Sequence, residues 1–380
     1  MWSATPTRCQ PPQAPHEHHP TVSPPARTDR RTAAGVREPL SRPTIRDVSR
    51  LAGVSRMTVS RVIRGLDVVL PETRDRVNKA IADLGYVPDR AAGSLSTRRT
   101  GFIALMLPTL TNTNFAAVAH GLTEALRASD YHLLIAYTDY SLDEEDRQLR
   151  NLLARRPEAM VLTGSVHRRT ASRLLLASDI PVVQIADLPQ QPFQHAVGFS
   201  NYQVGRTAAR HLLERGFRAI GAVASAPEGD VVDHRGEERM RGFEDELRLN
   251  GRSTDWVLRH GQAPVSYEHG VALAQMLLRR ECRPDAVFAV SDLSAVGMVL
   301  ECQRQGVRIP EDLSVMGFGD FEIGAQINPP LTTVHVDFRA LGQTTGQLLL
   351  ELLATGGNDA SRVVDVGLRV IERASVKAAG

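Results

Sequence analysis

Arginine and hydroxyl side chains recur at short spacing in the segment SRMTVSRVIRG, which covers residues 55–65. The planar guanidinium groups of Arg56, Arg61 and Arg64 can form forked hydrogen bonds to guanine or to phosphate. The hydroxyl groups of Thr58 and Ser60 can bond to phosphate oxygens. This chemistry is suited to DNA, and the alternative is an ordinary basic helix face exposed to solvent.

Helical periodicity predicts the elements that would position these side chains. A first helix begins after Thr44, a plausible N-cap, and its apolar face consists of Ile45, Val48, Leu51 and Ala52. Gly53 comes next and is suited to end this helix, because a left-handed conformation costs glycine little. Ser55 can then cap a second helix. That helix buries Val59, Val62 and Ile63. A third helix is expected from about Glu72, with Leu70 standing where a capping Ser or Thr would be useful.

The distribution of charge separates the front of the chain from its body. Residues 42–99 hold 12 Arg or Lys against 6 Asp or Glu, whereas residues 100–380 carry a net charge of −6. A basic front joined to an acidic body suggests that only the front meets a polyanion. Residues 1–41 are rich in Pro, Arg, Thr and His and poor in large apolar residues, so we expect them to be a disordered tail.

The body alternates apolar, strand-like runs with segments of helical period. The runs are FIALML (102–107), HLLIAYT (132–138), AMVLTG (159–164), PVVQIAD (181–187), AIGAVAS (219–225), AVFAVSD (286–292) and LSVMGFG (313–319). Helix-period segments such as 114–129 and 202–216 lie between them. This pattern predicts an α/β fold with parallel sheets covered on both faces, in which ligands bind beyond the carboxyl ends of the strands.

Several classes of protein lack support in the sequence. No apolar run approaches the length of a membrane helix, and no secretory signal is visible. Cys9, Cys282 and Cys302 include no close pair and no metal-ligand spacing, which fits a reducing cytoplasm and predicts neither a metal site nor a cofactor. We find no phosphate-binding GxxxxGK[ST] loop, no GxSxG elbow and no GxGxxG after the first strand, so we expect no enzyme.

The segment TIRDVSRLAGVSRMTVSRVI (44–63) closely resembles the DNA-binding headpiece of the lactose-repressor (LacI/GalR) family of bacterial transcription regulators. The resemblance continues through TRDRVNKAIADLGYVPDRAAGSL (73–95), AVFAVSDLSAVG (286–297) and IPEDLSVMGFGD (309–320). It implies a helix-turn-helix domain at 42–88, a hinge helix and linker at 89–100, and a two-lobed core at 101–380. The core would resemble periplasmic binding proteins, and it would bind an effector and dimerise.

The resemblance also implies which residues contact DNA. The recognition helix would read bases through Arg56, Met57 and Arg61, and the hinge would insert Leu95 between central base pairs. Two copies of the headpiece would bind a pseudo-palindromic double-stranded operator. The full predicted DNA-binding set is Thr44, Ser55, Arg56, Met57, Thr58, Ser60, Arg61, Arg64, Tyr86, Arg90, Ala92 and Leu95.

A small-molecule effector is expected between the lobes. The predicted effector-binding residues are Asn114, Phe115, Arg235, Arg239, Asp292, Phe318 and Asp320. Carboxylates can accept paired hydroxyl hydrogen bonds, phenylalanine can stack on a sugar face, and arginine can pair with a carboxylate. The alternative for the two arginines is an exposed position on a helix.

The segments LPTLTNTNFAAV, RPEAMVLTG, AVGFSN and LECQRQGV look most like the gluconate-operon repressor branch of the family. A sugar acid such as gluconate is therefore the expected effector, and a neutral or phosphorylated sugar is the alternative. The competing function is a solute-binding protein of a sugar transporter, which would share the body's fold but has no use for the headpiece.

Overall fold

The computed structural model describes residues 42–88, 99–356 and 360–377. The chain divides into two compact units at residue 89, and each unit is considered by itself. The proposed tail, 1–41, lies outside the described residues. The same holds for most of the proposed hinge, including Arg90, Ala92 and Leu95.

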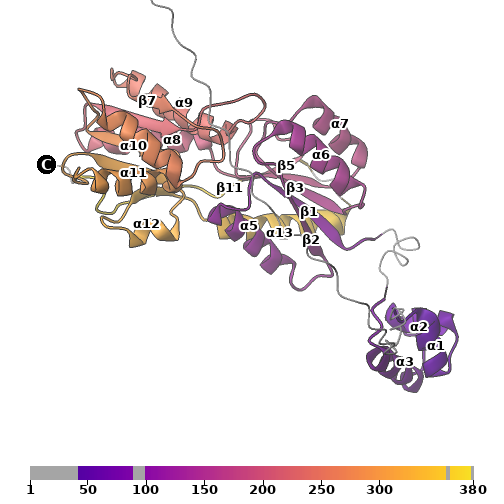
Figure 1. The fold of residues 1–380 in the computed structure, drawn as a ribbon. Helices are drawn as coiled ribbons and strands as arrows, with labels where there is room; N and C mark the ends of the chain where they lie inside the picture. The colour runs from indigo at the N-terminus through magenta and orange to yellow at the C-terminus, as the bar shows by residue number, and fades with distance from the viewer. Residues whose placement is uncertain (1–41, 89–98, 357–359, 378–380) are drawn as a thin grey trace, which may run out of the picture. The chain divides into compact units, whose positions relative to one another are not determined.

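The first unit consists of three short helices around one small apolar core (Figure 1). These are α1 (Ile45–Ala52), α2 (Arg56–Ile63) and α3 (Pro71–Leu84). The local signals act as predicted. The backbone nitrogen and the hydroxyl of Thr44 both donate to Asp47, at 3.0 and 2.7 Å. Gly53 is left-handed, with φ of 64°. The hydroxyl of Ser55 accepts from the backbone nitrogen of Thr58 at 3.1 Å.

Leu51 and Leu70 lie near the ends of the helices. Leu51 was expected to be buried, but its exposed fraction is 54%. Val48 and Ala52 already close this small core, so the prediction for Leu51 was wrong. Leu70 is the N-cap of α3 and makes no side-chain capping bond, as expected. Pro71 follows at the first helical position, where its missing N–H leaves one fewer donor to satisfy.

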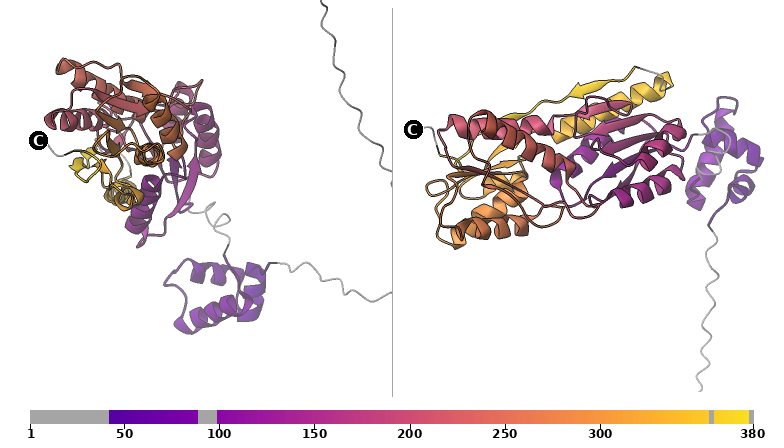
Figure 2. Two further views of the ribbon diagram at one scale, coloured as in Figure 1. Left: turned by 60° about the vertical axis from the view of Figure 1, so that its left-hand side comes forward. Right: turned by 90° about the horizontal axis from the view of Figure 1, so that it is seen from above.

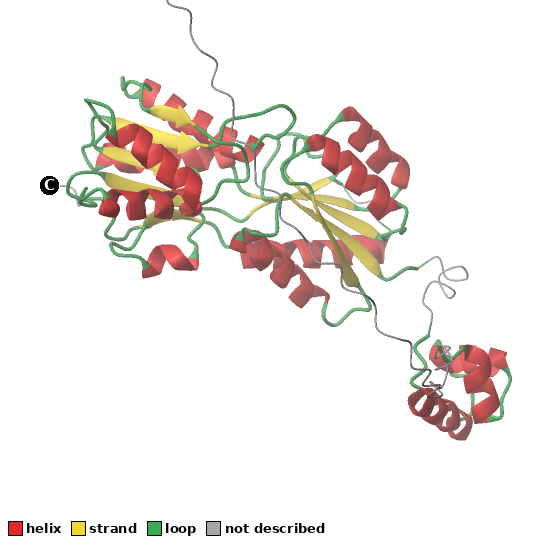
Figure 3. Ribbon diagram, viewed as in Figure 1, coloured by secondary structure: helices red, strands yellow, loops and turns green. Residues whose placement is uncertain are grey.

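The second unit contains two lobes, each built on a six-stranded sheet with helices on both faces (Figures 1 and 3). Lobe 1 has the strand order β11-β5-β4-β3-β1-β2, and all its pairs are parallel. Its strands are β1 (Phe102–Leu107), β2 (His132–Tyr137), β3 (Ala159–Thr163), β4 (Val182–Ile185), β5 (His195–Gly198) and β11 (Val363–Asp365). Its helices are α5 (Thr113–Leu126), α6 (Leu142–Leu153), α7 (Arg169–Ser178) and α13 (Phe338–Thr355).

Lobe 2 repeats this plan with the strand order β12-β10-β9-β8-β6-β7. Its strands are β6 (Ile220–Ala224), β7 (Val257–Arg259), β8 (Ala286–Ala289), β9 (Ser314–Phe318), β10 (Thr332–His335) and β12 (Arg369–Ile371). Its helices are α8 (Asn201–Glu214), α9 (His234–Leu249), α10 (Tyr267–Leu278), α11 (Asp292–Arg304) and α12 (Glu322–Gln326). Only the β10–β12 pair is antiparallel among the strand pairs of the described residues.

Alternation along each central strand explains why both faces are apolar. In β1, Ile103 and Leu105 pack with α5 and α13, whereas Ala104 and Met106 pack with α6 and α7. Each strand is therefore buried on two sides and becomes a nearly continuous apolar run. This confirms the predicted α/β class, and no helix in the described ranges is long and apolar enough to cross a membrane.

The chain passes between the lobes three times. The crossings are residues 199–200, 336–337 and 366–368, which join β5 to α8, β10 to α13 and β11 to β12. Viewed from above, the last crossing runs along one side of the two sheets (Figure 2). Both lobes are therefore built from segments that are distant in the sequence.

Some helices approach each other more closely than side chains would allow. A Cβ atom on Gly205 of α8 would lie 1.8 Å from the carbonyl oxygen of Arg239, and one on Gly242 of α9 would lie 2.0 Å from that of Tyr202. Gly121 of α5 and Gly342 of α13 face each other's helix in the same way. Backbone contact of this kind leaves no room for any other residue.

Five short strands, β5, β7, β10, β11 and β12, were not predicted. Each has only three or four residues. β4 and β8 are as short, but they lie within the longer apolar runs PVVQIAD and AVFAVSD. The five missed strands were not recognised as such runs, and their extended conformation is fixed by pairing with a neighbouring strand.

Gly121→Ala tests the close contact of α5 with α13. A Cβ atom there would lie 2.1 Å from the carbonyl oxygen of Arg339, so one backbone must move. We expect the free energy of unfolding to fall by roughly 1–3 kcal/mol, as for other overpacked cores. Urea titration followed by circular dichroism measures it.

Gly324→Ala in α12 is the matched control, because its Cβ atom would meet nothing nearer than 3.4 Å. We expect it to leave stability unchanged or slightly higher. Equal losses in the two variants would contradict the close-contact explanation.

Candidate functional sites

The exposed face of α2 carries unpaired positive charge. Arg56, Arg61 and Arg64 are all exposed, and within the described part of the chain none of them forms an ion pair or a side-chain hydrogen bond. Val59 and Val62 anchor the opposite face in the core. Because an unpaired surface arginine keeps its five donors free, this face can meet phosphates or base edges without first breaking an internal bond.

The other predicted DNA-contacting side chains of this unit have mixed exposure. Met57 is 64% exposed, and Thr44 and Ser55 are also exposed. Thr58, Ser60 and Tyr86 are half-buried, and Tyr86 packs against the core of the three helices. The hydroxyls of Ser55 and Thr58 lie 2.9 Å apart, so each already has a partner at the start of α2.

A cavity of about 620 Å³ lies between the two lobes of the second unit. Lobe 1 lines it with residues that follow its strands, including Thr138, Gly164 and Asp187. Lobe 2 contributes the first turns of α8 and α9, including Asn201 and His234. The cavity therefore lies at the carboxyl ends of the lobe 1 strands, which is where the sequence pattern predicts that a ligand binds.

Five of the seven predicted effector-binding residues come together beside this cavity. Asn114, Phe115, Arg235, Arg239 and Phe318 line a second, smaller cavity of about 30 Å³, and Arg235 lines both cavities. The Nδ2 atom of Asn114 donates to the carbonyl oxygen of Gly319 at 3.1 Å, which joins lobe 1 to lobe 2.

The two arginines of α9 lie against aromatic rings. The guanidinium carbon of Arg235 lies 5.5 Å from the ring centre of Phe115 and 5.7 Å from that of Tyr140. That of Arg239 lies 4.5 Å from the ring centre of Phe318. Arg239 is buried, so the alternative of an exposed helix position is wrong for it. Rings can stabilise a desolvated cation through their negative faces.

Asp233 provides the nearby negative charge. Its carboxylate lies 3.4 Å from Arg239 and 4.0 Å from Arg235, and it also caps α9 by accepting from the nitrogen of Gly236. Burial lowers the pKa of Arg239 and raises the pKa of Tyr140 to about 12. One carboxylate thus faces two arginines, and the larger cavity also carries Glu145, Asp187, Glu237, Glu238 and Arg241, so charges of both signs line the cleft.

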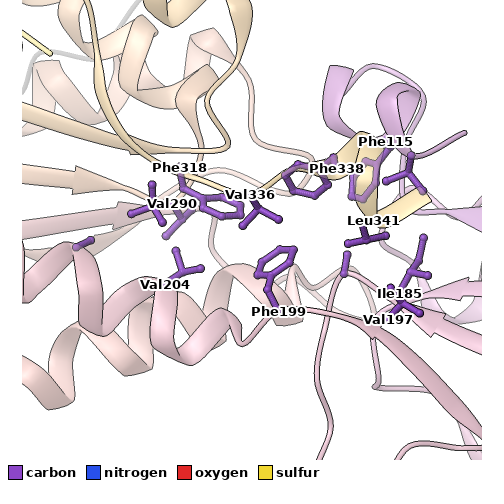
Figure 4. Close-up of a cluster of buried hydrophobic side chains, with 14 of the residues drawn as sticks. Phe115, Ile185, Val197, Phe199, Val204, Val290, Phe318, Val336, Phe338 and Leu341 are labelled. Atoms are coloured by element: carbon purple, nitrogen blue, oxygen red, sulfur yellow. The ribbon is translucent and has the colours of Figure 1, made fainter. Parts of the chain in front are cut away.

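Three phenylalanine rings form the apolar floor where the lobes meet (Figure 4). The ring centres of Phe199 and Phe318 lie 5.8 Å apart, and those of Phe199 and Phe338 lie 5.7 Å apart. Phe199 lies in the crossing at 199–200, and Phe338 directly follows the crossing at 336–337. The same cluster that supports Arg239 therefore holds the lobes together.

Asp292 and Asp320 do not line either cavity. β8 ends at Ala289, so Asp292 is the first residue of α11 rather than the end of a strand. Its carboxylate accepts from the nitrogen of Phe321 at 2.8 Å and the hydroxyl of Thr333 at 2.7 Å. These bonds hold it inside lobe 2, and its role in effector binding stays a prediction.

Asp320 is likewise engaged within lobe 2. Its carboxylate pairs with His335 at 2.9 Å and with Arg373 at 2.6 Å. Within the ranges that the structure describes, no group of three or more His, Cys, Asp or Glu side chains could hold a metal ion.

Polar residues of the larger cavity were missed by the sequence analysis. They include Tyr140, Glu145, Ser165, Asp187, Asn201 and His234. Asp187 could have been found, because it ends the run PVVQIAD, but the others come from loops and helix starts with no distinctive pattern.

The lobes also touch at the edge away from the crossings. Asp230 of lobe 2 accepts from the hydroxyl of Ser141 at 2.6 Å and from the nitrogen of Asp143 at 3.3 Å, at the start of α6. The nitrogen of Val232 donates to the carbonyl oxygen of Tyr140 at 3.2 Å. The cleft is therefore bridged on both sides.

Comparison with known proteins gives two family matches. The profile described as "Bacterial regulatory proteins, lacI family" matches residues 44–89, and that of a periplasmic binding protein-like domain matches residues 209–376. The chain is 34% identical over 334 residues to the HTH-type transcriptional regulator GntR of Pseudomonas aeruginosa, covering 88% of this chain and 96% of that protein.

Two solved structures are also similar. One is a transcriptional regulator CelR–cellobiose complex, with 31% identity and a TM-score of 0.62 over 88% of this chain and all of that one. The other is the lac repressor dimer bound to operator and the anti-inducer ONPF, with 24% identity and a TM-score of 0.77 over 89% of this chain and all of that one. The second likeness shows the fold alone.

Burial of Asp292 predicts a stability that depends on pH. Desolvation, together with the charge of Asp320, raises its pKa from 3.8 to about 7, against the opposing effects of Thr333, the nitrogen of Phe321 and Arg373. A carboxyl whose pKa is higher in the folded state favours folding while it is protonated. Its contribution is therefore complete below about pH 4 and is lost as the pH rises to about 7.

The difference in the free energy of unfolding between wild type and Asp292→Asn should fall by roughly 4 kcal/mol as the pH rises across that window, because one pKa unit corresponds to about 1.4 kcal/mol. Asparagine keeps an acceptor for Phe321 and cannot titrate. Urea titrations of both proteins between pH 4 and 8 measure the difference, in which other titrating groups cancel. A difference that stays constant with pH contradicts the buried-carboxyl interpretation.

Proposed function

Because the chain belongs to the LacI family of bacterial regulatory proteins, we propose that it represses genes for sugar-acid utilisation and that gluconate, or a similar acid, releases it from its operator. The family consists of DNA-binding transcription regulators with an effector domain, not of enzymes. A solute-binding protein of a transporter would have no use for the three-helix unit. A regulator of bacterial genes works in the cytoplasm, which is where we place this protein.

The observation that carries DNA binding is the free arginine face of α2. Two exposed guanidinium groups, of Arg56 and Arg61, project from one short helix, a third belongs to its C-cap Arg64, and the other face of the helix is fixed in a core. A helix of this kind can enter the major groove with its donors already oriented. In this proposal Arg56, Met57 and Arg61 read bases, whereas Thr44, Ser55, Ser60 and Tyr86 position the phosphates.

We further propose that two copies bind one pseudo-palindromic operator. A single α2 offers few base contacts, so useful affinity needs a second headpiece related by two-fold symmetry. The lac repressor, whose fold this chain shares, was solved as a dimer bound to operator.

The effector proposal rests on the charge in the cleft. Arg235 reaches both cavities and shares one carboxylate, Asp233, with Arg239. A ligand carboxylate could pair with the guanidinium of Arg235, and the cavity of about 620 Å³ is large enough for a six-carbon acid. The CelR complex holds cellobiose, a neutral sugar, so a neutral sugar is the second candidate.

Arg61→Ala separates the reading of bases from the positioning of phosphates. Loss of a bidentate contact to guanine should cost roughly 1–3 kcal/mol and relax base preference at one operator position in each half-site. Tyr86→Phe should weaken all sequences about equally, because phosphates carry no sequence. Binding-site selection followed by sequencing measures both, and the wild-type sites should be pseudo-palindromes. If Arg61→Ala keeps the base preferences of wild type, as Tyr86→Phe is expected to do, the role given to Arg61 is wrong.

Arg235→Ala tests the acid-binding role of the cleft. We expect gluconate to raise the melting temperature of wild type and to release operator in a gel shift, with at least tenfold weaker effects in the variant. Arg248→Ala, an exposed residue of the same helix paired with Glu244 and Asp245, is the matched control and should respond like wild type. A wild-type protein that ignores gluconate would overturn the choice of effector.

A further inference from the structure

The loop between β6 and α9 reaches from lobe 2 across the cleft to the start of α6 in lobe 1. Residues 228–232 of this loop are here called the strap. The nitrogen of Glu228 donates to the carbonyl oxygen of Val231 at 3.1 Å, and the nitrogen of Val231 donates back at 3.0 Å. Gly229 has φ of 60°, as the first central residue of a type II′ turn requires. The strap is therefore a tight turn with a defined shape.

Asp230, at the tip of the strap, completes the cap of α6. A helix leaves its first backbone nitrogens without partners, and one N-cap residue satisfies only some of them. The N-cap Ser141 accepts from the nitrogen of Glu144 at 3.1 Å. The nitrogen of Asp143 donates instead to the carboxylate of Asp230 at 3.3 Å, and the hydroxyl of Ser141 donates to the same oxygen at 2.6 Å. A residue of lobe 2 thus supplies part of the cap of a lobe 1 helix.

The charges around Asp230 favour this contact. The positive end of a helix attracts a carboxylate, but the first turn of α6 already contains three carboxylates of its own. Each of these has a cationic partner: Asp143 pairs with Arg168, Glu144 with Arg147, and Glu145 with His167. Hydrogen bonds from Ser141 and the nitrogen of Asp143 lower the pKa of Asp230, and Arg168 adds to the effect. Asp230 is therefore ionised at neutral pH.

The lobe 1 side of the contact is a second tight turn, held under strain. A hydrogen bond of 3.0 Å closes residues 138–141, and the two central residues, Asp139 and Tyr140, are left-handed, with φ of 48° and 64°. This conformation is costly for a residue with a Cβ atom and persists only where the surroundings enforce it. The nitrogen of Val232 donates to the carbonyl oxygen of Tyr140 at 3.2 Å, and the Tyr140 ring lies against Arg235. The strap therefore helps to hold Tyr140 against Arg235.

We propose that the strap is a latch that holds the two lobes together without a ligand, and that Asp230 is its essential residue. All of its contacts are made between protein groups, so the latch can close on an empty cleft. The lobes would part first where Asp230 leaves the start of α6. Because Tyr140 contacts both the strap and Arg235, a ligand bound at Arg235 would shift this equilibrium. That link to a ligand rests on the proposed function, whereas the latch itself does not.

A thiol placed between the lobes measures how often they separate. Val290 lines the smaller cavity and is fully buried, so a thiol reagent reaches Val290→Cys only when the lobes part or lobe 2 unfolds. The natural Cys302, buried in the core of lobe 2, distinguishes the two events, because only unfolding exposes it. Labelling of the full chain with iodoacetamide, followed by peptide mass mapping, gives both rates in one experiment.

Asp230→Ala, made in the Val290→Cys protein, removes the carboxylate of the latch. We expect labelling at position 290 to become roughly tenfold faster, because a hydrogen bond to a charged group shifts an equilibrium by about that factor. Labelling of Cys302 should not change. Glu228→Gln is the matched control, since it removes an exposed carboxylate of the same turn, and it should label like the parent. An unchanged rate at position 290 in Asp230→Ala, or a rate at Cys302 that rises with it, overturns the latch.

Ser141→Cys combined with Val231→Cys tests the same contact in the opposite direction. The two residues face each other in an antiparallel bridge, where Cα atoms about 4.5 Å apart permit a disulfide. With the disulfide confirmed by mass mapping, labelling at position 290 should be roughly tenfold slower than after reduction. This variant keeps the test decisive if Asp230→Ala folds poorly.

Equal rates in the disulfide-bonded and reduced proteins would show that the lobes do not separate at the strap, which overturns the proposal. Neither measurement requires an effector. A protein that ignores gluconate would therefore overturn the sugar-acid proposal and leave the result on the latch intact.

Discussion

The backbone contact between α8 and α9 is the constraint on which the cleft depends. Gly205 and Gly242 bring these helices so close that the carbonyl oxygen of Arg239 would lie 1.8 Å from a Cβ atom on Gly205. Asn201 begins one helix, and Arg239 lies in the other. Only this separation lets Arg239 donate to Asn201 at 2.6 Å while its guanidinium rests on Phe318. The close packing of α8 against α9 thus fixes the position of the Arg239 guanidinium.

The two units use arginine in opposite ways. At α2 the guanidinium groups are exposed and have no partner among the described residues, so their interaction with DNA depends on the dense spacing of phosphates and falls as salt rises. In the cleft, Arg239 is buried among rings, one carboxylate and an amide. Removing such a charge from water is costly, and partners with fixed geometry are what make it tolerable. The first arrangement suits a large polyanion, whereas the second holds one buried cation in a fixed position.

The lobes are linked in a way that can transmit a small change. Three crossings join them near one edge of each sheet, and at the other edge Asp230 accepts from Ser141 while the nitrogen of Val232 donates to Tyr140. The crossings are covalent, whereas these hydrogen bonds are reversible. A ligand that bridges the cleft would favour the joined state. A coupling of about 1–3 kcal/mol is enough to change occupancy at a second site 5- to 150-fold.

The sequence by itself determined the three-helix unit and the class of the body. Caps at Thr44 and Ser55, the turn at Gly53 and the apolar faces are local signals, and apolar runs such as FIALML mark strands buried on both sides. Local signals are readable because the residues that interact lie within a few positions of one another.

Only the tertiary structure decided what the cleft contains. The Asp292 side chain points into lobe 2, where its carboxylate accepts hydrogen bonds from Thr333 and Phe321. The fold also brings Asp187, Asn201 and Arg239 together. Those partners are separated by many residues, and the short strands that align them exist only through pairing. A charge buried beside distant neighbours has no signature in its own segment, because its energy depends on which groups the fold brings around it.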